Sequence, residues 1–143
     1  MPNHVTNKLC ITGPKKDREA FLATLKKPGY GERPAGEFCF HQTVPMPSDI
    51  SRDNLSFDEM ERNPRNWYRW SCDNWGTKWC NYETSPVEVG SKSVKVEFRT
   101  AWSPPDAWMI RASELFPTLK FCNKWKDEGG PSGTHTYRNG DAA

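Results

Sequence analysis

Alternation of apolar and polar residues predicts the β-strands of this chain. Between residues 93 and 102, Val94, Val96 and Phe98 alternate with charged residues. This period of two is typical of a strand with one face buried and one face in solvent. The same pattern predicts further strands at residues 5–12, 38–44 and 119–125, and an extended segment at residues 77–87.

Helical periodicity and capping residues predict three helices. Residues 15–25 carry apolar side chains on one side and charges on the other. The stretch Ser103-Pro104-Pro105-Asp106 has the composition of a helix start, with Ser103 as the cap and Pro117 ending the helix. Asn63-Pro64 is expected to open a short aromatic helix that ends at Gly76.

The order of these elements indicates an α+β fold. A β-α-β-β-α-β core gives a ferredoxin-like sandwich, in which helices cover one face of an antiparallel sheet. Residues 48–76 form a helical insertion, whose acidic first part, residues 48–63, is expected to be a mobile loop. We expect a single domain over residues 1–126 and a polar, flexible tail over residues 127–143.

Tryptophan is concentrated in one short segment. Residues 67–79 hold four of the seven tryptophans. On the predicted helix, Tyr68, Cys72 and Trp75 share a stripe that is expected to face the core. Trp102, which precedes two prolines, is expected to clamp the corner between a strand and a helix.

Trp70 is the exception on the predicted helix, because it is expected to face outward. Trp and Arg are residue types that anchor protein interfaces. An exposed Trp70 flanked by Arg65 and Arg69 is therefore a candidate partner-binding site. Three acidic residues of the preceding loop complete the expected set: Asp49, Asp53 and Asp58.

Composition narrows the chemistry. The net charge of +2 gives little general attraction for nucleic acid or membranes. The five cysteines have no CxxC spacing, which predicts reduced thiols in a cytoplasmic protein and no zinc site. His4, His41 and His135 lie far apart without a nucleophile motif, so no catalytic residue, cofactor or metal ligand is expected. No secretory signal and no membrane-spanning apolar run are present in the sequence.

Five motifs occur in order along the chain: MPNHVTNKLCITG at residues 1–13, VPMP at 44–47, NWGTKW at 74–79, FRTAWSPP at 98–105 and LFPTLKF at 115–121. Together they resemble the Api92-like proteins of phages and plasmids, also described as the YubB ferredoxin-like or DUF1281 family. The resemblance covers most of residues 1–125 and implies the ferredoxin-like fold. His4 stands where an aromatic residue, usually Trp, is expected in the family.

The resemblance also implies a functional context, because small accessory proteins of mobile elements often antagonise host defence. The expected function is therefore non-enzymatic: binding and inhibition of a host defence protein or ribonucleoprotein complex, of the anti-CRISPR or anti-restriction type, in the host cytoplasm. The alternative is a single-stranded RNA or DNA binder, in which Phe38, Phe40 and Tyr82 stack bases on the sheet. The missing RNP consensus and the low net charge count against this alternative.

Overall fold

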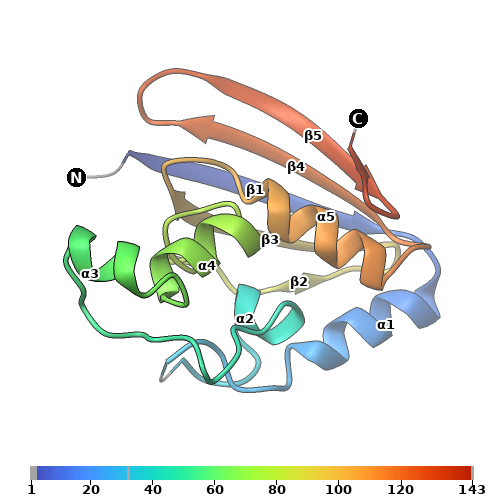
Figure 1. Cartoon of the computed structure of the whole chain (residues 1–143). Helices are drawn as coiled ribbons and strands as arrows, with labels where there is room; N and C mark the ends of the chain where they lie inside the picture. The colour runs from blue at the N-terminus through green and yellow to red at the C-terminus, as the bar shows by residue number, and fades with distance from the viewer. Residues whose placement is uncertain (1–2, 32, 143) are drawn as a thin grey trace.

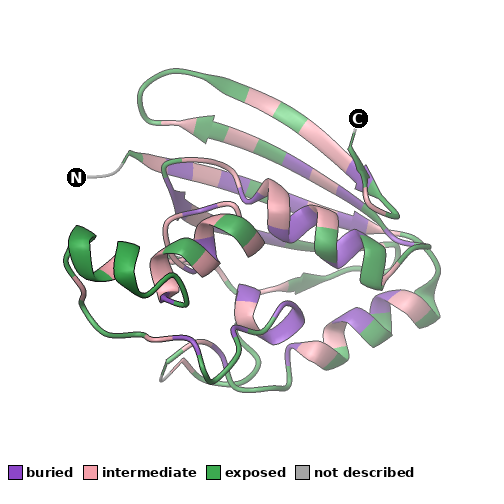
Figure 2. Ribbon diagram, in the orientation of Figure 1, coloured by how far each residue is buried: buried purple, intermediate pink, exposed green. Residues whose placement is uncertain are grey.

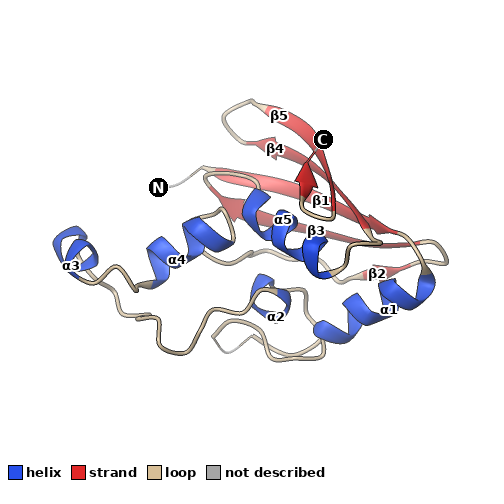
Figure 3. Cartoon of the chain, turned by 45° about the vertical axis from the view of Figure 1, so that its right-hand side comes forward, coloured by secondary structure: helices blue, strands red, loops and turns tan. Residues whose placement is uncertain are grey.

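A computed structural model describes residues 3–31 and 33–142, and within this part the chain forms one sheet covered by helices on one face (Figures 1 and 3). The described strands are β1 (His4–Thr12), β2 (Glu88–Val89), β3 (Ser93–Ala101), β4 (Lys120–Asp127), β5 (Ser132–Arg138) and β6 (Asp141–Ala142). The described helices are α1 (Lys15–Thr24), α2 (Phe40–Thr43), α3 (Phe57–Arg62), α4 (Trp67–Asn74) and α5 (Asp106–Leu115). None of the helices in this part of the chain is long and apolar enough to cross a membrane.

The sheet has the strand order β2-β3-β1-β4-β5-β6, and each neighbouring pair is antiparallel. Strands β4-β1-β3-β2, with α1 and α5 between them in sequence, have the order of a β-α-β-β-α-β ferredoxin-like fold. Helices α2, α3 and α4 lie in the long connection between α1 and β2 (Figure 1). The predicted fold class and its helical insertion are therefore confirmed.

The core lies between the sheet and the helices. On β1, buried residues alternate with residues that face away from the helices, as the colours in Figure 2 show. Two fully buried tryptophans fix the insertion to this core through their indole N–H groups. Trp75 donates to the carbonyl of Val44 at 2.9 Å, and Trp108 on α5 donates to the carbonyl of Phe40 at 3.1 Å.

The strand predicted over residues 38–44 is wrong. Residues 40–43 form the short helix α2, and Phe38, Cys39 and Phe40 are all buried. The side chain of Gln42 accepts the backbone N–H of Cys39 at 3.0 Å and closes the turn. Phe38 and Phe40 are two residues apart, as in a strand, but Cys39 between them is buried as well. The segment is therefore buried on all sides and is not a strand with one exposed face.

The flexible tail predicted over residues 127–143 is also wrong, because residues 132–138 form β5. In this strand Tyr137 pairs with Phe121 of β4 and is only 1% exposed. Most other side chains of β5 are polar, and several face solvent. Because Tyr137 is the one large buried side chain of β5, the composition of this strand resembles that of a polar loop.

The insertion is more ordered than predicted. The expected loop over residues 48–63 contains α3, which begins at Ser56, whose hydroxyl accepts the N–H of Glu59 at 3.3 Å. Helix α4 begins three residues later than Asn63-Pro64 suggested, because the side chain of Asn66 accepts the N–H of Arg69 at 3.0 Å. Gly76 ends this helix with φ 78°, as predicted.

The start of α5 also differs from the prediction. The helix begins at Asp106, and Ser103 does not cap it. The hydroxyl of Ser103 instead donates to the carbonyl of Gly76 at 2.6 Å and so joins the ends of two helices. Leu115, the last residue of this helix, is exposed.

Candidate partner-binding site

One side of α4 packs against the core. Trp67, Trp70 and Ser71 lie on this side, and Tyr68 points away from it. The ring of Trp70 packs edge-on against Trp75 with centroids 5.0 Å apart. The expectation that Trp70 faces outward is therefore wrong, because Trp67 and Trp70 pack against the core beside Trp75.

Aromatic side chains from separate segments of the chain line a groove of about 510 Å³ beside α4. The residues that shape it are Phe57, Trp67, Tyr68, Lys78, Trp79 and Trp102, and we call it the aromatic groove. Phe57 comes from α3, and Trp102 follows the last residue of β3. The groove exists only because the fold brings the insertion against the end of the sheet.

Tyr68 lies at the centre of the aromatic groove. It makes edge-to-face contacts with Trp67 and Trp102, with centroids 5.9 and 5.8 Å apart. The ammonium group of Lys78 lies 4.8 Å from the ring of Trp79 and 5.0 Å from the ring of Trp102. Such contacts hold the rings in fixed positions and place one positive charge at the groove.

Two of the lining residues are unusually accessible for their size. The exposed fraction is 80% for Phe57 and 43% for Trp102. Trp102 also has φ 75°, a backbone conformation that is unfavourable for a large L-residue. Exposed apolar rings gathered in one groove, one of them on a strained backbone, are typical of a binding surface.

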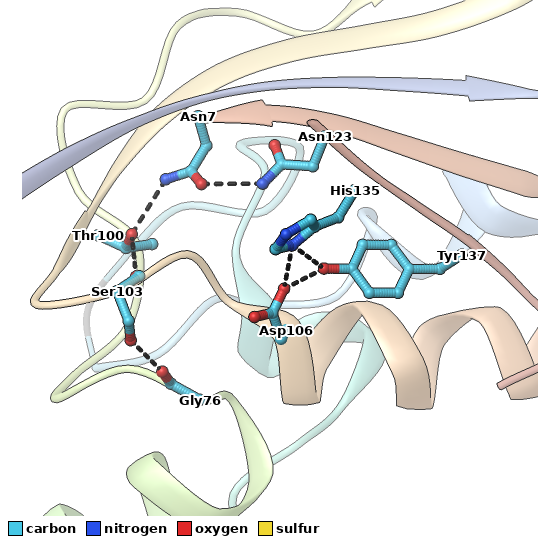
Figure 4. Close-up of polar contacts among 8 residues, drawn as sticks. All are labelled: Asn7, Gly76, Thr100, Ser103, Asp106, Asn123, His135 and Tyr137. Atoms are coloured by element: carbon cyan, nitrogen blue, oxygen red, sulfur yellow. Dashed lines mark hydrogen bonds and ion pairs between the residues drawn. The ribbon is translucent and has the colours of Figure 1, made fainter. Parts of the chain in front are cut away.

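A chain of hydrogen bonds under the sheet holds the segment that carries Trp102 (Figure 4). Buried Asn123 donates to Asn7 at 3.0 Å, and Asn7 donates to Thr100 at 3.0 Å. The hydroxyl of Thr100 then donates to the carbonyl of Ser103 at 2.7 Å. Ser103 in turn donates to Gly76, so the two chain segments that flank Trp102 and Lys78 are fixed to each other and to the sheet.

A second polar cluster joins β5 to the first turn of α5 (Figure 4). The hydroxyl of Tyr137 donates to Asp106, and Nδ1 of His135 lies 3.1 Å from the same carboxylate oxygen. Burial, followed by the hydrogen bond to Asp106, raises the pKa of Tyr137 well above its ordinary value. The phenol is therefore protonated at neutral pH and holds the C-terminal strand in place.

The six residues expected to bind a partner lie around the insertion. Two of them border the aromatic groove: the carbonyl of Asp53 accepts the indole N–H of Trp67 at 2.9 Å, and Asp58 follows Phe57 in α3. Arg65 and Asp49 form an ion pair with both side chains 62% exposed. Arg69 is exposed on α4. The structure thus brings Asp53 and Asp58 to the groove and turns Trp70 away from solvent.

Sequence reasoning missed Phe57, Lys78 and the outward side of α4. The density of tryptophan drew attention to residues 67–79, several of which line the groove, but the groove also depends on Trp102, which is distant in sequence. Trp102 was expected to be a clamp at a corner, and it is instead half exposed.

The residues named for base stacking are not on one surface. Phe38 and Phe40 are buried in the core, so the structure excludes them from contact with a nucleic acid. Tyr82 pairs with Arg99 of β3, and its hydroxyl is bonded to His4 at the end of β1. Stacking on three aromatic residues of the sheet is therefore wrong.

The five cysteines are free thiols. Cys39 and Cys80 are buried with their sulfur atoms 3.1 Å apart, and burial raises the pKa of Cys80 well above its ordinary value. In residues 3–31 and 33–142, no group of three or more His, Cys, Asp or Glu side chains is placed to hold a metal ion.

The sheet topology and the covering helices define the chain as an α+β protein of the ferredoxin-like class. Residues 74–143 match the profile of the ferredoxin-like domain in Api92-like protein. This match confirms the resemblance seen in the motifs for the part of the chain that the profile covers.

A solved structure has the same fold over the full length of the chain. The crystal structure of a protein api92 from Yersinia pseudotuberculosis is similar with a TM-score of 0.63, covering 100% of this chain and 98% of that chain. The sequences are 9% identical, so this likeness concerns the fold. A comparison with curated protein sequences gave no match.

Proposed function

We propose that this protein acts by binding another protein through the aromatic groove, and that the partner is a host defence protein or ribonucleoprotein complex that is inhibited by the binding. The single observation that carries the binding proposal is the cluster of accessible rings around Tyr68, with Trp102 held on a strained backbone. Rings that are already fixed lose little conformational freedom when a partner binds.

The chemistry of the groove suggests what the partner presents. Its floor is aromatic, and Lys78 contributes a cation beside Trp79 and Trp102. An apolar side chain of the partner would fill the groove, with a carboxylate or backbone carbonyl close to Lys78. The exposed ions Asp58 and Arg69, together with the Arg65–Asp49 pair, would form a polar rim.

Support for an inhibitor of host defence comes from the resemblance to proteins of phages and plasmids, and we place the protein in the host cytoplasm on the same ground. The proposed mechanism needs no catalytic residue: the complex is blocked by occupation of its surface. Anti-CRISPR and anti-restriction activities are the two forms of this proposal.

An affinity capture from nuclease-treated host lysate, analysed by mass spectrometry, tests the binding step. Three proteins are compared: the natural chain, Phe57→Ala in the groove, and Leu115→Ala as a matched exposed apolar residue outside it. We expect a stoichiometric defence complex with the natural chain and with Leu115→Ala, and its loss with Phe57→Ala. Equal capture by all three proteins would show that the groove is not the binding surface.

A plating assay tests inhibition. Cells with an active CRISPR or restriction system are challenged with a targeted phage while they express the natural chain or Phe57→Ala. Plaque numbers should rise only with the natural chain, and should be equal in cells that lack the defence system. No rise in any defended strain would contradict the inhibitor proposal.

A further inference from the structure

The face of the sheet that lies away from the helices has a different character from the aromatic groove. The strand register places lysines in neighbouring positions on it: Lys8 of β1 lies opposite Lys124 of β4, and Lys126 lies opposite Thr6. Lys120 and Lys95 extend the set along β4 and across to β3. All five lysines are exposed, and we call these residues the lysine strip: Lys8, Lys95, Lys120, Lys124 and Lys126.

The lysine strip is poor in negative charge. On the exposed face of β1, β4 and β5, the register gives Lys, Arg, His, Cys, Thr and Ser, and no Asp or Glu, among the described residues. The acidic residues of this face, Glu88 and Glu97, lie on β2 and β3, where Glu97 is opposite Lys8 and Glu88 is opposite Lys95. None of the five lysines takes part in an ion pair within the described part of the chain. Five lysines against two glutamates concentrate more positive charge here than the net +2 of the whole chain.

The face is also hollowed. A shallow depression of about 690 Å³ lies over β1, β3 and β4, and Lys8, Lys95, Lys120 and Lys124 line it. The segment with Ser85, Pro86 and Glu88 forms its wall on the β2 side. Hydroxyl groups of Thr12 on β1 and of Thr134 and Thr136 on β5 stand in or beside the same rows and can donate hydrogen bonds.

We propose that the lysine strip binds the phosphate backbone of a single-stranded nucleic acid. Ammonium and hydroxyl donors without any competing carboxylate on β1 and β4 match a row of phosphate oxygens. Strands β1 and β4 carry no Phe, Tyr or Trp on this face, so contacts are to phosphate and sugar and are independent of base sequence. Two residues along a strand span about 7 Å, so Lys120 to Lys126 covers about 20 Å of an extended backbone.

The distribution of charge favours one strand over a duplex. A duplex presents two phosphate rows, and the second row would lie over Glu97 and Glu88 on the β2–β3 side. A single row placed along β4 stays one strand away from Glu97, which lies opposite Lys8 on β3, and meets positive and neutral groups. This site is independent of the partner proposed for the aromatic groove, since the two surfaces share no lining residue.

Fluorescence anisotropy with a labelled oligouridylate of about twelve nucleotides tests the proposal. We expect affinity to fall steeply between low and physiological salt. Lys8→Gln/Lys124→Gln should weaken binding about tenfold and lower the slope of log K against log salt by about 1.4, which is two phosphate contacts on a single strand. Lys8→Arg/Lys124→Arg should retain binding, because it keeps both charges.

The matched control is Lys16→Gln/Lys26→Gln, which removes the same charge from exposed positions at α1 on the other side of the sheet. Equal weakening by the control and by Lys8→Gln/Lys124→Gln would overturn the location. Equal affinity for a duplex of the same length would overturn the preference for one strand. Displacement by polyglutamate as efficient as by unlabelled oligouridylate would overturn nucleic acid as the ligand. Thermal melts of all variants show whether each has folded, and the Arg variant keeps the test decisive if the Gln variant does not fold.

Discussion

Trp102 combines a half-exposed indole with a left-handed backbone conformation. A side chain with a Cβ atom is strained at φ 75°, whereas glycine is not. At most positions Ala is more favourable than Gly because Gly gains more freedom on unfolding, and at this position the order should reverse. Trp102→Gly should therefore be more stable than Trp102→Ala by about 1 kcal/mol, measured by urea unfolding.

Both Trp102 variants remove the same ring, so both should lose the partner that binds the aromatic groove. If Trp102→Ala is the more stable of the two, the backbone at this position is relaxed. Strain would then give no support to the assignment of the groove.

His41 provides a test at acidic pH. Its Nδ1 accepts the backbone N–H of Met46 at 2.9 Å, which requires an unprotonated nitrogen. Burial and the nearby Arg52 lower the pKa of His41. In the unfolded chain the pKa of His41 is about 6.5. As the pH falls below this value, the unfolded chain binds a proton at His41 and the folded chain does not, so the free energy of unfolding decreases.

His41→Asn keeps an oxygen acceptor and removes the titration. Between about pH 7 and pH 5, the natural chain should lose stability with a slope below the one-proton maximum of about 1.4 kcal/mol per pH unit. The Asn variant should have a smaller slope in urea unfolding over the same range. Identical slopes for both proteins would assign the acid sensitivity to other groups.

Among the elements, those with regular alternation were predictable. Val94, Val96 and Phe98 face the helices in turn, so β3 was correct within one residue of each end. Helix α4 was found, but its buried side was wrong, because Trp67 and Ser71 face the core in place of Tyr68 and Cys72. The predicted and observed stripes are one residue apart and share Trp75, so the spacing of the aromatic residues alone did not distinguish them.

Strand β5 was missed because Tyr137 is its only fully buried residue. If β5 is part of the folded domain, Tyr137→Ala should cost about 3–5 kcal/mol of unfolding free energy, as truncation of a buried aromatic side chain does. Thr136→Ala, on the other face of the strand, should cost at most about 1 kcal/mol. The effects are measured by chemical denaturation. Equal small effects of the two substitutions would mean that residues 132–138 are a flexible tail and not part of the folded domain.

At the scale of the whole molecule, neither the aromatic groove nor the lysine strip could be predicted from composition. The net charge of +2 averages a lysine-rich sheet face with an acidic insertion. The register of β1 with β4 reveals that Lys8 and Lys124 are neighbours, and no local pattern encodes that register. The aromatic groove likewise requires Phe57, Tyr68 and Trp102 to meet, which depends on the helical insertion docking on the sheet.

The two surfaces should act independently. The aromatic groove is built on the helical insertion, and the lysine strip lies on the sheet face away from the helices, without a shared lining residue. Substitutions at distant sites without shared contacts add within about 0.5 kcal/mol. Phe57→Ala combined with Lys8→Gln/Lys124→Gln should therefore lose partner binding as Phe57→Ala does, and lose oligouridylate binding as the lysine variant does. Titrations of both ligands with the three variants measure this. A coupling clearly above that limit would mean that partner and nucleic acid are bound as one assembled surface.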